Sequence, residues 1–268
     1  MKRIGFIGAG NMAEAIIKGL ASTGSYEIRA TNRSNQAKLE EMREVYQVVP
    51  STFEEVLERS EILVLAVKPK DVSGVLSNMS NLNLENKLVI SVAAGISLNL
   101  IQKYLPGNPI VRAMPNTSSA VMHSMTGLVE GQGVKELHRK DTEDIFGAVG
   151  KFMWIPEERM NCLMAISGSG PAYFYLFTEA LVNAGVEFGF STEEAETLAK
   201  TTLIGAAKML AETTKSPGQL REEVTSPKGT TLEALNVFWD SGLEKVVGQA
   251  TRACRNRGEA MEREYGGE

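Results

Sequence analysis

The stretch Lys2-Arg3-Ile4-Gly5-Phe6-Ile7-Gly8-Ala9-Gly10-Asn11-Met12-Ala13 decides the fold of this chain. A short apolar strand runs directly into G-x-G-x-x-A and then into a helical pattern. Gly8 permits a tight turn, Gly10 lets the backbone approach a pyrophosphate, and Ala13 keeps the helix close to the strand. The N–H groups at the start of that helix then point at an anion. We therefore expect a dinucleotide site here, although an ordinary strand-to-helix turn with two glycines has the same pattern.

The composition is that of a protein that binds small molecules. The chain has 268 residues, of which 43% are hydrophobic, and this length allows one or two domains. Its 28 basic and 33 acidic residues give a net charge of −5, which argues against binding to nucleic acid or to an anionic membrane surface. Cys162 and Cys254 lie far apart without metal-ligand spacing, so we expect no metal site and no disulfide framework.

Nothing in the sequence resembles a targeting or membrane segment. The first residues lack the long apolar region and the small-residue cleavage site of a signal peptide. Wholly apolar stretches such as 62–67 are far too short to cross a bilayer. We therefore expect a soluble protein in the reducing cytoplasm.

Strand-like runs alternate with helical stretches through the first half, and this alternation predicts a largely parallel sheet with helices on its faces. The helix from Asn11 to Thr23 follows the glycine turn and ends before Gly24. The expected strands are Ile4–Ile7, Glu27–Thr31, Ile62–Val67, Leu88–Ser91 and Ile110–Ala113, with Thr126–Glu130 and Phe152–Ile155 less clear.

After Ile155-Pro156 no further strand is convincing, and long helical patterns take over. We expect an α/β protein with an N-terminal Rossmann-type dinucleotide-binding domain over residues 1–156 and an all-α domain over residues 157–268. Residues 171–188 are apolar on nearly every side, and a second helix is expected over 192–213 after the N-cap residue Ser191.

So many apolar helix faces cannot all be buried within about a hundred residues, so we expect this domain to form a homodimer. A large core within one chain is the alternative. Further association of dimers is left open. The charged tail, Glu259–Glu268, is expected to fray.

The end of the second expected strand indicates which dinucleotide is bound. An acidic residue usually follows this strand and binds the ribose 2′-hydroxyl of NAD, whereas Asn32, Arg33 and Ser34 stand here. An arginine suits a 2′-phosphate, which favours NADPH while NADH stays possible. In the alternative, Arg33 faces water and either cofactor is accepted.

Later strand ends should line the same crevice, because open parallel sheets bind ligands beyond their carboxyl ends. Ala66-Val67-Lys68-Pro69, Ser91-Val92-Ala93-Ala94-Gly95 and 112–117 follow successive strands. A lysine there has a place near the nicotinamide, but Lys-Pro is also a common solvated helix start. Asn116 either caps a turn or donates to the cofactor carboxamide, and the sequence alone favours the turn.

Two segments of the helical half combine hydroxyl groups with helix starts. SGSGPAY (167–173) opens one helix, and TSPKGTT (225–231) places hydroxyls and free N–H groups at the start of another. The second arrangement suits a small carboxylate. N-capping by Ser226 or Thr230 is an equally good explanation on physical grounds.

Taken together, these motifs resemble pyrroline-5-carboxylate reductase. The glycine turn, the pieces 66–69 and 112–116, SGSGPAY and the loop 226–231 occur in that family's order and span nearly the whole chain. The resemblance implies reduction of 1-pyrroline-5-carboxylate to L-proline, the last step of proline biosynthesis. It also implies a Rossmann domain, a helical dimerisation domain and an active site where the two meet across subunits.

The resemblance also implies roles for individual residues. Thr231 lies near the ring nitrogen and is the catalytic candidate, while the backbone around Gly229, Thr230 and Thr231 receives the substrate carboxylate. Glu157 falls at a position near both ligands, and we add Ser226 as a substrate-binding candidate from its place in the loop. The implied cofactor-binding residues are Ile7, Gly8, Ala9, Gly10, Asn11, Met12, Asn32, Ala66, Val67, Lys68, Pro69, Val92, Ala93 and Ala94, to which the residues themselves add Arg33, Ser34 and Asn116.

The chain departs from the family pattern at two places. The family loop often reads Ser-Pro-Gly-Gly, and Lys228 replaces the first of those glycines, which brings a positive charge near the carboxylate. Phe53 stands where some members have a polar residue toward the adenosine.

Hydride transfer to a protonated cyclic imine needs no strong acid, which suits a chain with only His123 and His138. Two rival functions remain. One is another reductase of the β-hydroxyacid dehydrogenase type, and the other is a non-catalytic NADP-binding regulator.

Overall fold

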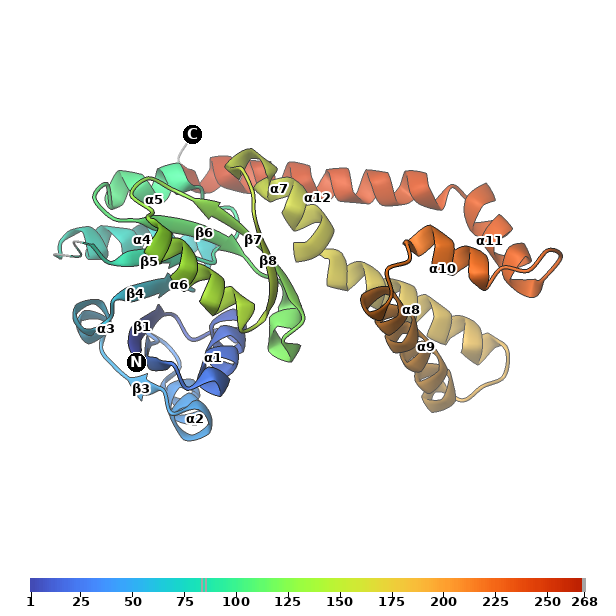
Figure 1. Ribbon diagram of the computed structural model, residues 1–268, viewed down its shortest axis with the longest axis horizontal. Helices are drawn as coiled ribbons and strands as arrows, with labels where there is room; N and C mark the ends of the chain where they lie inside the picture. The colour runs from blue at the N-terminus through green and yellow to red at the C-terminus, as the bar shows by residue number, and fades with distance from the viewer. Residues whose placement is uncertain (83, 85, 267–268) are drawn as a thin grey trace. The chain divides into compact units, whose positions relative to one another are not determined.

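The computed structural model describes residues 1–82, 84 and 86–266 (Figure 1). Contacts divide the chain into two compact units. The first contains Met1–Ser169 and the residues from Ala253 onward, and the second is Gly170–Arg252. The expected boundary after Pro156 differs from this division, because residues 157–169 and the last turns of the chain belong to the first unit.

The first unit is built on one eight-stranded sheet with the order β3-β2-β1-β4-β5-β6-β7-β8. All neighbouring strands are parallel except β6 and β7. The order from β3 to β6 is that of dinucleotide-binding folds. Strands β1 to β3 are added toward one edge of the sheet and β4 to β6 toward the other, so the switch point lies between β1 and β4. The strands are β1 Lys2–Ile7, β2 Tyr26–Thr31, β3 Val49–Pro50, β4 Ile62–Leu65, β5 Leu88–Ser91, β6 Ile110–Met114, β7 Ser124–Glu130 and β8 Gly150–Trp154.

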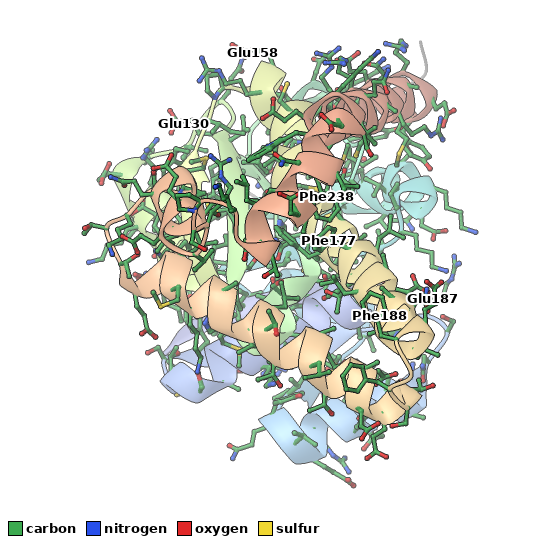
Figure 2. All side chains as sticks on the ribbon, turned by 90° about the vertical axis from the view of Figure 1, so that its right-hand side faces the viewer. Glu130, Glu158, Phe177, Glu187, Phe188 and Phe238 are labelled. Atoms are coloured by element: carbon green, nitrogen blue, oxygen red, sulfur yellow. The ribbon has the colours of Figure 1, made fainter. Side chains whose placement is uncertain are left out.

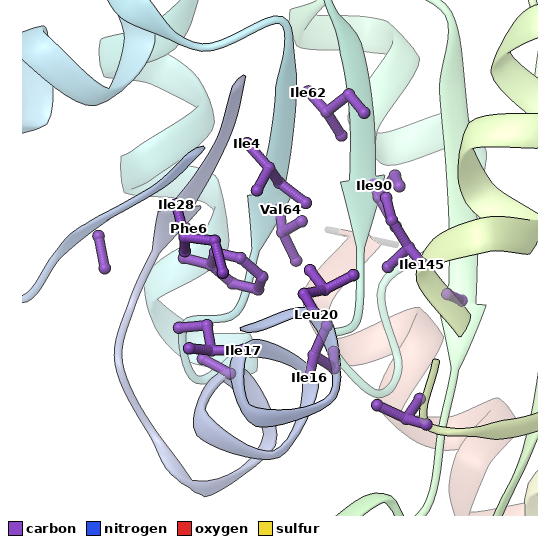
Figure 3. Close-up of a cluster of buried hydrophobic side chains, with 14 of the residues drawn as sticks. Ile4, Phe6, Ile16, Ile17, Leu20, Ile28, Ile62, Val64, Ile90 and Ile145 are labelled. Atoms are coloured by element: carbon purple, nitrogen blue, oxygen red, sulfur yellow. The ribbon is translucent and has the colours of Figure 1, made fainter. Parts of the chain in front are cut away.

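Helices cover both faces of this sheet, which explains why β4 and β5 are buried along their whole lengths and are apolar except for Ser91. One hydrophobic core lies against α1, α2 and α6 (Figure 3), and a second lies against α3, α4, α5 and α7. The helices are α1 Asn11–Thr23, α2 Gln36–Tyr46, α3 Phe53–Arg59, α4 Pro69–Ser80, α5 Leu98–Tyr104, α6 Glu136–Gly147 and α7 Met160–Leu163, with short turns η1 Thr117–Val121, η2 Glu157–Arg159 and η3 Met164–Gly168.

Most expected elements of the first unit are confirmed, including the helix from Asn11 to Thr23 with Gly24 as its left-handed C-cap. The expected strand Ile62–Val67 is wrong at its end, because β4 stops at Leu65 and the next residues form the loop before α4. The short edge strand β3 was not expected, since Pro50 lies within it. An edge position tolerates proline because the missing N–H is not needed for pairing.

The second unit is entirely helical over its described residues, as expected. It contains α8 Gly170–Glu187, α9 Thr192–Glu212, α10 Pro217–Glu223, α11 Thr230–Asp240 and the first turns of α12 Leu243–Gly266. Ser191 caps α9 by accepting from the N–H of Glu194 at 3.3 Å, and the Glu194 carboxylate accepts from the N–H of Ser191 at 2.8 Å. These reciprocal bonds fix the start of α9.

Apolar side chains of the second unit are largely exposed in the single chain. Phe177 of α8 contacts Phe238 of α11 with ring centroids 5.9 Å apart (Figure 2). Other apolar side chains remain open, with Leu176 of α8 67% exposed and Phe188, directly after α8, 81% exposed. An apolar surface of this kind is typical of a helix that packs against another molecule.

The expectation of a frayed tail is wrong for its described part, whereas residues 267 and 268 lie outside the described residues. Helix α12 continues to Gly266, and its last turns belong to the unit that contains the sheet. Gly258 and Met261 contact that unit, and Tyr265 packs against its second core. Charged residues dominate this tail, but a few spaced residues are enough to hold one helix face.

No helix among the described residues combines the length and the apolar character that a membrane span requires.

Candidate functional site

The carboxyl ends of β2, β1 and β4 come together around Gly8. The N–H of Gly8 donates to the carbonyl of Thr31 at 3.0 Å, and the N–H of Ala66 donates to the carbonyl of Ile7 at 2.9 Å. Gly8 has φ +104°, and a Cβ there would lie 2.6 Å from the carbonyl oxygen of Ala66. A side chain at this position is therefore excluded by both the conformation and the neighbouring backbone.

Gly10 is a glycine for a different reason. It is the N-cap of α1 with extended backbone, and apart from the adjacent residues no atom of the described chain lies within 4 Å of a Cβ placed there. The protein's own packing would therefore accept a side chain. The first N–H groups of α1, which include those of Asn11 and Met12, have no intrahelical acceptor and face this opening. The open space beside free N–H groups fits a phosphate ligand.

The residues after β2 place the charged side chain of Arg33 in solvent beside this turn. The Asn32 amide oxygen accepts from the N–H of Ser34 at 3.3 Å, which forms a local turn. The Arg33 side chain is 90% exposed, and its guanidinium lies 3.8 Å from the carboxylate of Asp71 in the first turn of α4. Such an exposed pair is weak, so the guanidinium is free to bind a stronger anion.

Lys68 and Pro69 form the start of α4, with the Lys68 backbone as N-cap and Pro69 in the first turn. The structure thus gives this pair the ordinary helix-start role that the sequence also allowed. After β5, the N–H of Ala93 donates to the hydroxyl of buried Ser91 at 3.4 Å, and Gly95 follows with φ +72°. The loop 92–97 therefore leaves the sheet through a tight turn.

Asn116 is buried and has a structural role in this chain. Its amide oxygen accepts from the N–H of Ser118 at 3.0 Å, which is the turn that the sequence favoured. Its amide nitrogen donates to the carbonyl of Ser167 at 2.9 Å, so it joins the end of β6 to the first residue of SGSGPAY. Two of the sequence motifs are therefore connected through one side chain.

Glu157 forms an ion pair that the sequence analysis missed. Its Oε1 accepts from the N–H of Leu98 at 2.7 Å and from the Arg112 guanidinium at 3.1 Å. Arg112 is 3% exposed and also donates to Glu262 at 2.6 Å. A signal was available in the sequence, because an arginine within the apolar strand 110–114 must find a carboxylate partner when the strand is buried.

The loop before α11 belongs to the second unit and turns sharply. Its last residue, Gly229, donates to the carbonyl of Ser226 at 3.0 Å. Pro227 and Lys228 lie between them, and Lys228 has φ +61°, which is the pattern of a type II turn. The left-handed conformation is easy for glycine and strained for lysine.

Thr230 and Thr231 occupy the first turn of α11, for which Gly229 is the N-cap. N–H groups at these positions have no intrahelical acceptor. Thr231 is half-buried and Thr230 is exposed. The first turn of an eleven-residue helix thus offers N–H donors and two hydroxyls, a combination that suits a carboxylate.

The strand order, the glycine turn and the open helix start define an α/β protein of the dinucleotide-binding class with an added helical unit. Comparison with known proteins assigns the family. Residues 157–261 match the family model described as pyrroline-5-carboxylate reductase dimerisation, and residues 3–95 match the model described as NADP oxidoreductase, coenzyme F420-dependent. The chain belongs to the pyrroline-5-carboxylate reductase family.

The similarity to individual relatives covers nearly the whole chain. This chain is 40% identical to pyrroline-5-carboxylate reductase of Pasteurella multocida, over 98% of each chain. A solved structure of a pyrroline-5-carboxylate reductase from Coxiella burnetii matches with a TM-score of 0.90 and 39% identity, over 96% of this chain and 97% of that one. A Plasmodium falciparum pyrroline carboxylate reductase with NADP bound matches with a TM-score of 0.87 and 30% identity, over 97% and 98%.

Proposed function

We propose that this protein reduces 1-pyrroline-5-carboxylate to L-proline with NAD(P)H, in the last step of proline biosynthesis. The observation that carries the proposal is the 40% identity to the Pasteurella multocida reductase over 98% of this chain. A match of that length includes both the glycine turn after β1 and the loop before α11.

A reduced nicotinamide dinucleotide, when bound, supplies a hydride. The residues fit such a ligand, because Gly10 leaves open space beside the free N–H groups of α1. We propose that the dinucleotide lies across the carboxyl ends of the strands. The proposed contacts are Ile7, Gly8, Ala9, Gly10, Asn11, Met12, Asn32, Arg33, Ser34, Ala66, Val67, Lys68, Pro69, Val92, Ala93, Ala94 and Asn116.

We propose NADPH as the preferred cofactor. The exposed guanidinium of Arg33 is able to donate two hydrogen bonds to a 2′-phosphate, and its present partner Asp71 holds it only at 3.8 Å. No acidic residue stands at 32–34, where a carboxylate would bind the ribose hydroxyls of NAD and repel the phosphate. The relative of known structure from Plasmodium falciparum was solved with NADP bound, which supports the same choice.

The substrate carboxylate is proposed to bind at the start of α11. The backbone around Gly229, Thr230 and Thr231 would receive it, with the N–H groups of Thr230 and Thr231 as donors, because the N–H of Gly229 already donates to the carbonyl of Ser226 at 3.0 Å. The hydride adds to C5 of the ring, the C=N double bond becomes a single bond, and the protonated ring nitrogen becomes the amine of proline. The Thr231 hydroxyl would orient the ring nitrogen, so the work of the protein would be mainly positioning.

We also propose that Glu157 binds the substrate, although one of its carboxylate oxygens is already engaged. Its Oε1 already accepts hydrogen bonds from Leu98 and Arg112. A direct contact with the imine would therefore use its other oxygen.

We propose that the helical unit forms a homodimer. The support is the exposed apolar surface of α8 and the residue after it, where Leu176 and Phe188 leave most of their area open in one chain. A self-complementary apolar surface is the usual basis of a two-fold dimer. The matched family model, described as a dimerisation model, covers the same helices.

Oxidation of NADPH and NADH, followed with pyrroline-5-carboxylate beside a panel of β-hydroxy and keto acids, tests the proposed reaction. The proposal requires turnover of the imine with formation of proline, and a KM for NADPH that is lower than the KM for NADH. Turnover of a keto acid instead would identify a reductase of the β-hydroxyacid dehydrogenase type. Tight NADPH binding with no turnover of any substrate would identify a non-catalytic regulator.

A further inference from the structure

The last turns of α12 place four residues on one face of the helix toward the sheet unit. Gly258, Met261, Glu262 and Tyr265 recur at intervals of three and four residues, which is the spacing of a single helix face. A Cβ at Gly258 would lie 2.6 Å from the amide oxygen of Asn161, so the helix backbone approaches α7 closely. This contact occurs within the first unit.

Glu262 makes the polar contacts of this face. One carboxylate oxygen accepts from Arg112 at 2.6 Å, and the other accepts from the amide nitrogen of Asn161 at 2.9 Å. Arg112 is 3% exposed and Asn161 is 8% exposed, so both donors are shielded from water. Hydrogen bonds between charged groups in such surroundings are stronger than those on the surface.

The same cluster holds both ends of the loop 92–97. Arg112 lies beside Ser91 in the sheet, and Ser91 is the last residue before the loop. Glu157, the second partner of Arg112, accepts from the N–H of Leu98, which is the first residue after the loop. The end of the loop is therefore held by a partner of the buried guanidinium, and its start follows the residue that pairs in the sheet with Arg112 itself.

Met261 packs against the middle of this loop, at Gly95. A Cβ at Gly95 would lie 2.9 Å from the Cβ of Met261 and 3.4 Å from the ring of Tyr265. The loop thus turns directly beneath the helix, and it contains Val92, Ala93 and Ala94. These three residues are proposed dinucleotide contacts, whereas the helix itself contains none.

We propose that Glu262 is a positioning residue, which acts through Arg112 and Glu157 and, with Met261, keeps the loop 92–97 in the conformation that binds the dinucleotide. The proposal rests on the proposed function for the identity of the ligand. We call the contacts of Glu262 and Met261 with Arg112 and the loop the brace. Loss of the brace increases the freedom of the loop, so the dinucleotide must order it on binding. Dinucleotide affinity then falls while the chemistry at saturation is unchanged.

Glu262→Gln and Met261→Ala test the brace by two different contacts, and Glu264→Gln is the matched control. Glu264 lies on the same helix turn and pairs with Arg257 on the exposed side. NADPH dissociation constants are measured by fluorescence titration without imine, and amide hydrogen exchange is measured over residues 92–98. Steady-state kinetics then separates KM for NADPH, KM for the imine and kcat.

Glu262→Gln and Met261→Ala are expected to raise the NADPH dissociation constant and KM by roughly 3- to 10-fold, the range of indirect couplings in proteins. Exchange over 92–98 should accelerate in both variants. Changes in kcat at saturating NADPH, and all changes in Glu264→Gln, should remain within about twofold, as for surface substitutions.

An unchanged NADPH dissociation constant in both brace variants would overturn the proposal, as would equal increases in KM for the imine and for NADPH. Should Glu262→Gln fail to fold, the affinity and exchange of Met261→Ala decide the question. A wild-type protein that binds no NADPH would instead refute the proposed function. Amide exchange alone then decides the brace, which is rejected if 92–98 exchanges equally in Glu262→Gln and Glu264→Gln.

Discussion

The guanidinium of Arg33 lies 3.8 Å from the carboxylate of Asp71, which connects the end of β2 to the first turn of α4 across the proposed nucleotide site. The pair is exposed, and it leaves the Arg33 donors free for a phosphate. For this reason Arg33→Ala should weaken NADPH binding about tenfold or more, the value of a hydrogen bond between charged groups, and leave NADH binding nearly unchanged. Titration of both cofactors checks this, and equal losses would argue against a 2′-phosphate contact.

Thr231→Ala should lower kcat/KM for the imine while NADPH affinity is nearly unchanged. The reason is that the hydroxyl is the proposed contact to the ring nitrogen, whereas the variant retains the backbone N–H groups of α11. We expect a reduction of about tenfold or more, as for a positioned group that assists proton placement. Thr231→Ser, which keeps the hydroxyl, is the control and should retain most of the activity. Unaltered imine kinetics in the alanine variant would remove Thr231 from the site.

Lys228→Gly should stabilise the protein by about 0.5–1 kcal/mol. Lys228 has φ +61°, a conformation that costs a side-chain-bearing residue about 1–2 kcal/mol, and part of the gain is offset by the greater freedom of glycine in the unfolded chain. Urea denaturation measures the difference. Lys228→Ala keeps the strain and should show no such gain, so equal stabilisation by alanine would contradict the explanation.

Stability should fall as the pH drops from about 7.5 to 5.5 because of His138. Burial lowers the pKa of His138 below its usual 6.5, while Asp141 raises it in opposition and Lys135 lowers it further. Below 6.5 the unfolded chain therefore binds a proton that the folded chain does not, which favours unfolding. Protonation also removes the acceptor at Nδ1 that receives the N–H of Lys135 at 3.1 Å.

Urea midpoints across this pH range, compared between wild type and His138→Gln, measure the contribution of His138. Glutamine keeps a hydrogen-bond acceptor but does not titrate, so the variant should lose less stability at pH 5.5 than the wild type. Identical pH profiles would show that His138 does not contribute.

Leu176→Glu should convert the proposed dimer to a monomer. A buried, unpaired carboxylate at an apolar interface costs several kcal/mol, which exceeds what most interfaces can absorb. Sedimentation velocity measures the mass. Leu137→Glu is the matched control, because Leu137 of α6 is 61% exposed and Leu176 is 67% exposed. A dimer that persists in the first variant, or dissociates in both, would place the interface elsewhere.

The sheet could be predicted because most strands are short apolar runs separated by helical patterns, and because parallel strands require helices on both faces. The exact end of β4 and the presence of β3 could not. Both depend on pairing between strands distant in sequence, which a local pattern does not contain. The starts of α1 and α9 were predictable because their signals are local: a glycine turn leads into α1, and Ser191 with Glu194 caps α9.

The candidate site was predictable where the chemistry is local, as in the glycine turn and the hydroxyls before α11. Glu262 was missed because its role arises only from folding. A glutamate in a charged tail resembles a solvated residue, and only the buried Arg112 shows that it has a partner. Asn116 illustrates the opposite case, because the local turn it forms was visible in the sequence, whereas its bond to Ser167 was not.

Gly10 is a position where stability and ligand binding make opposite demands. Its backbone is extended and the space around its Cα is open, so alanine would fit the folded chain. Replacing a glycine with alanine at such a position restricts the unfolded chain and typically stabilises a protein by about 0.4–1 kcal/mol. The chain forgoes this stability, and the methyl group that would provide it would occupy the space proposed for the pyrophosphate.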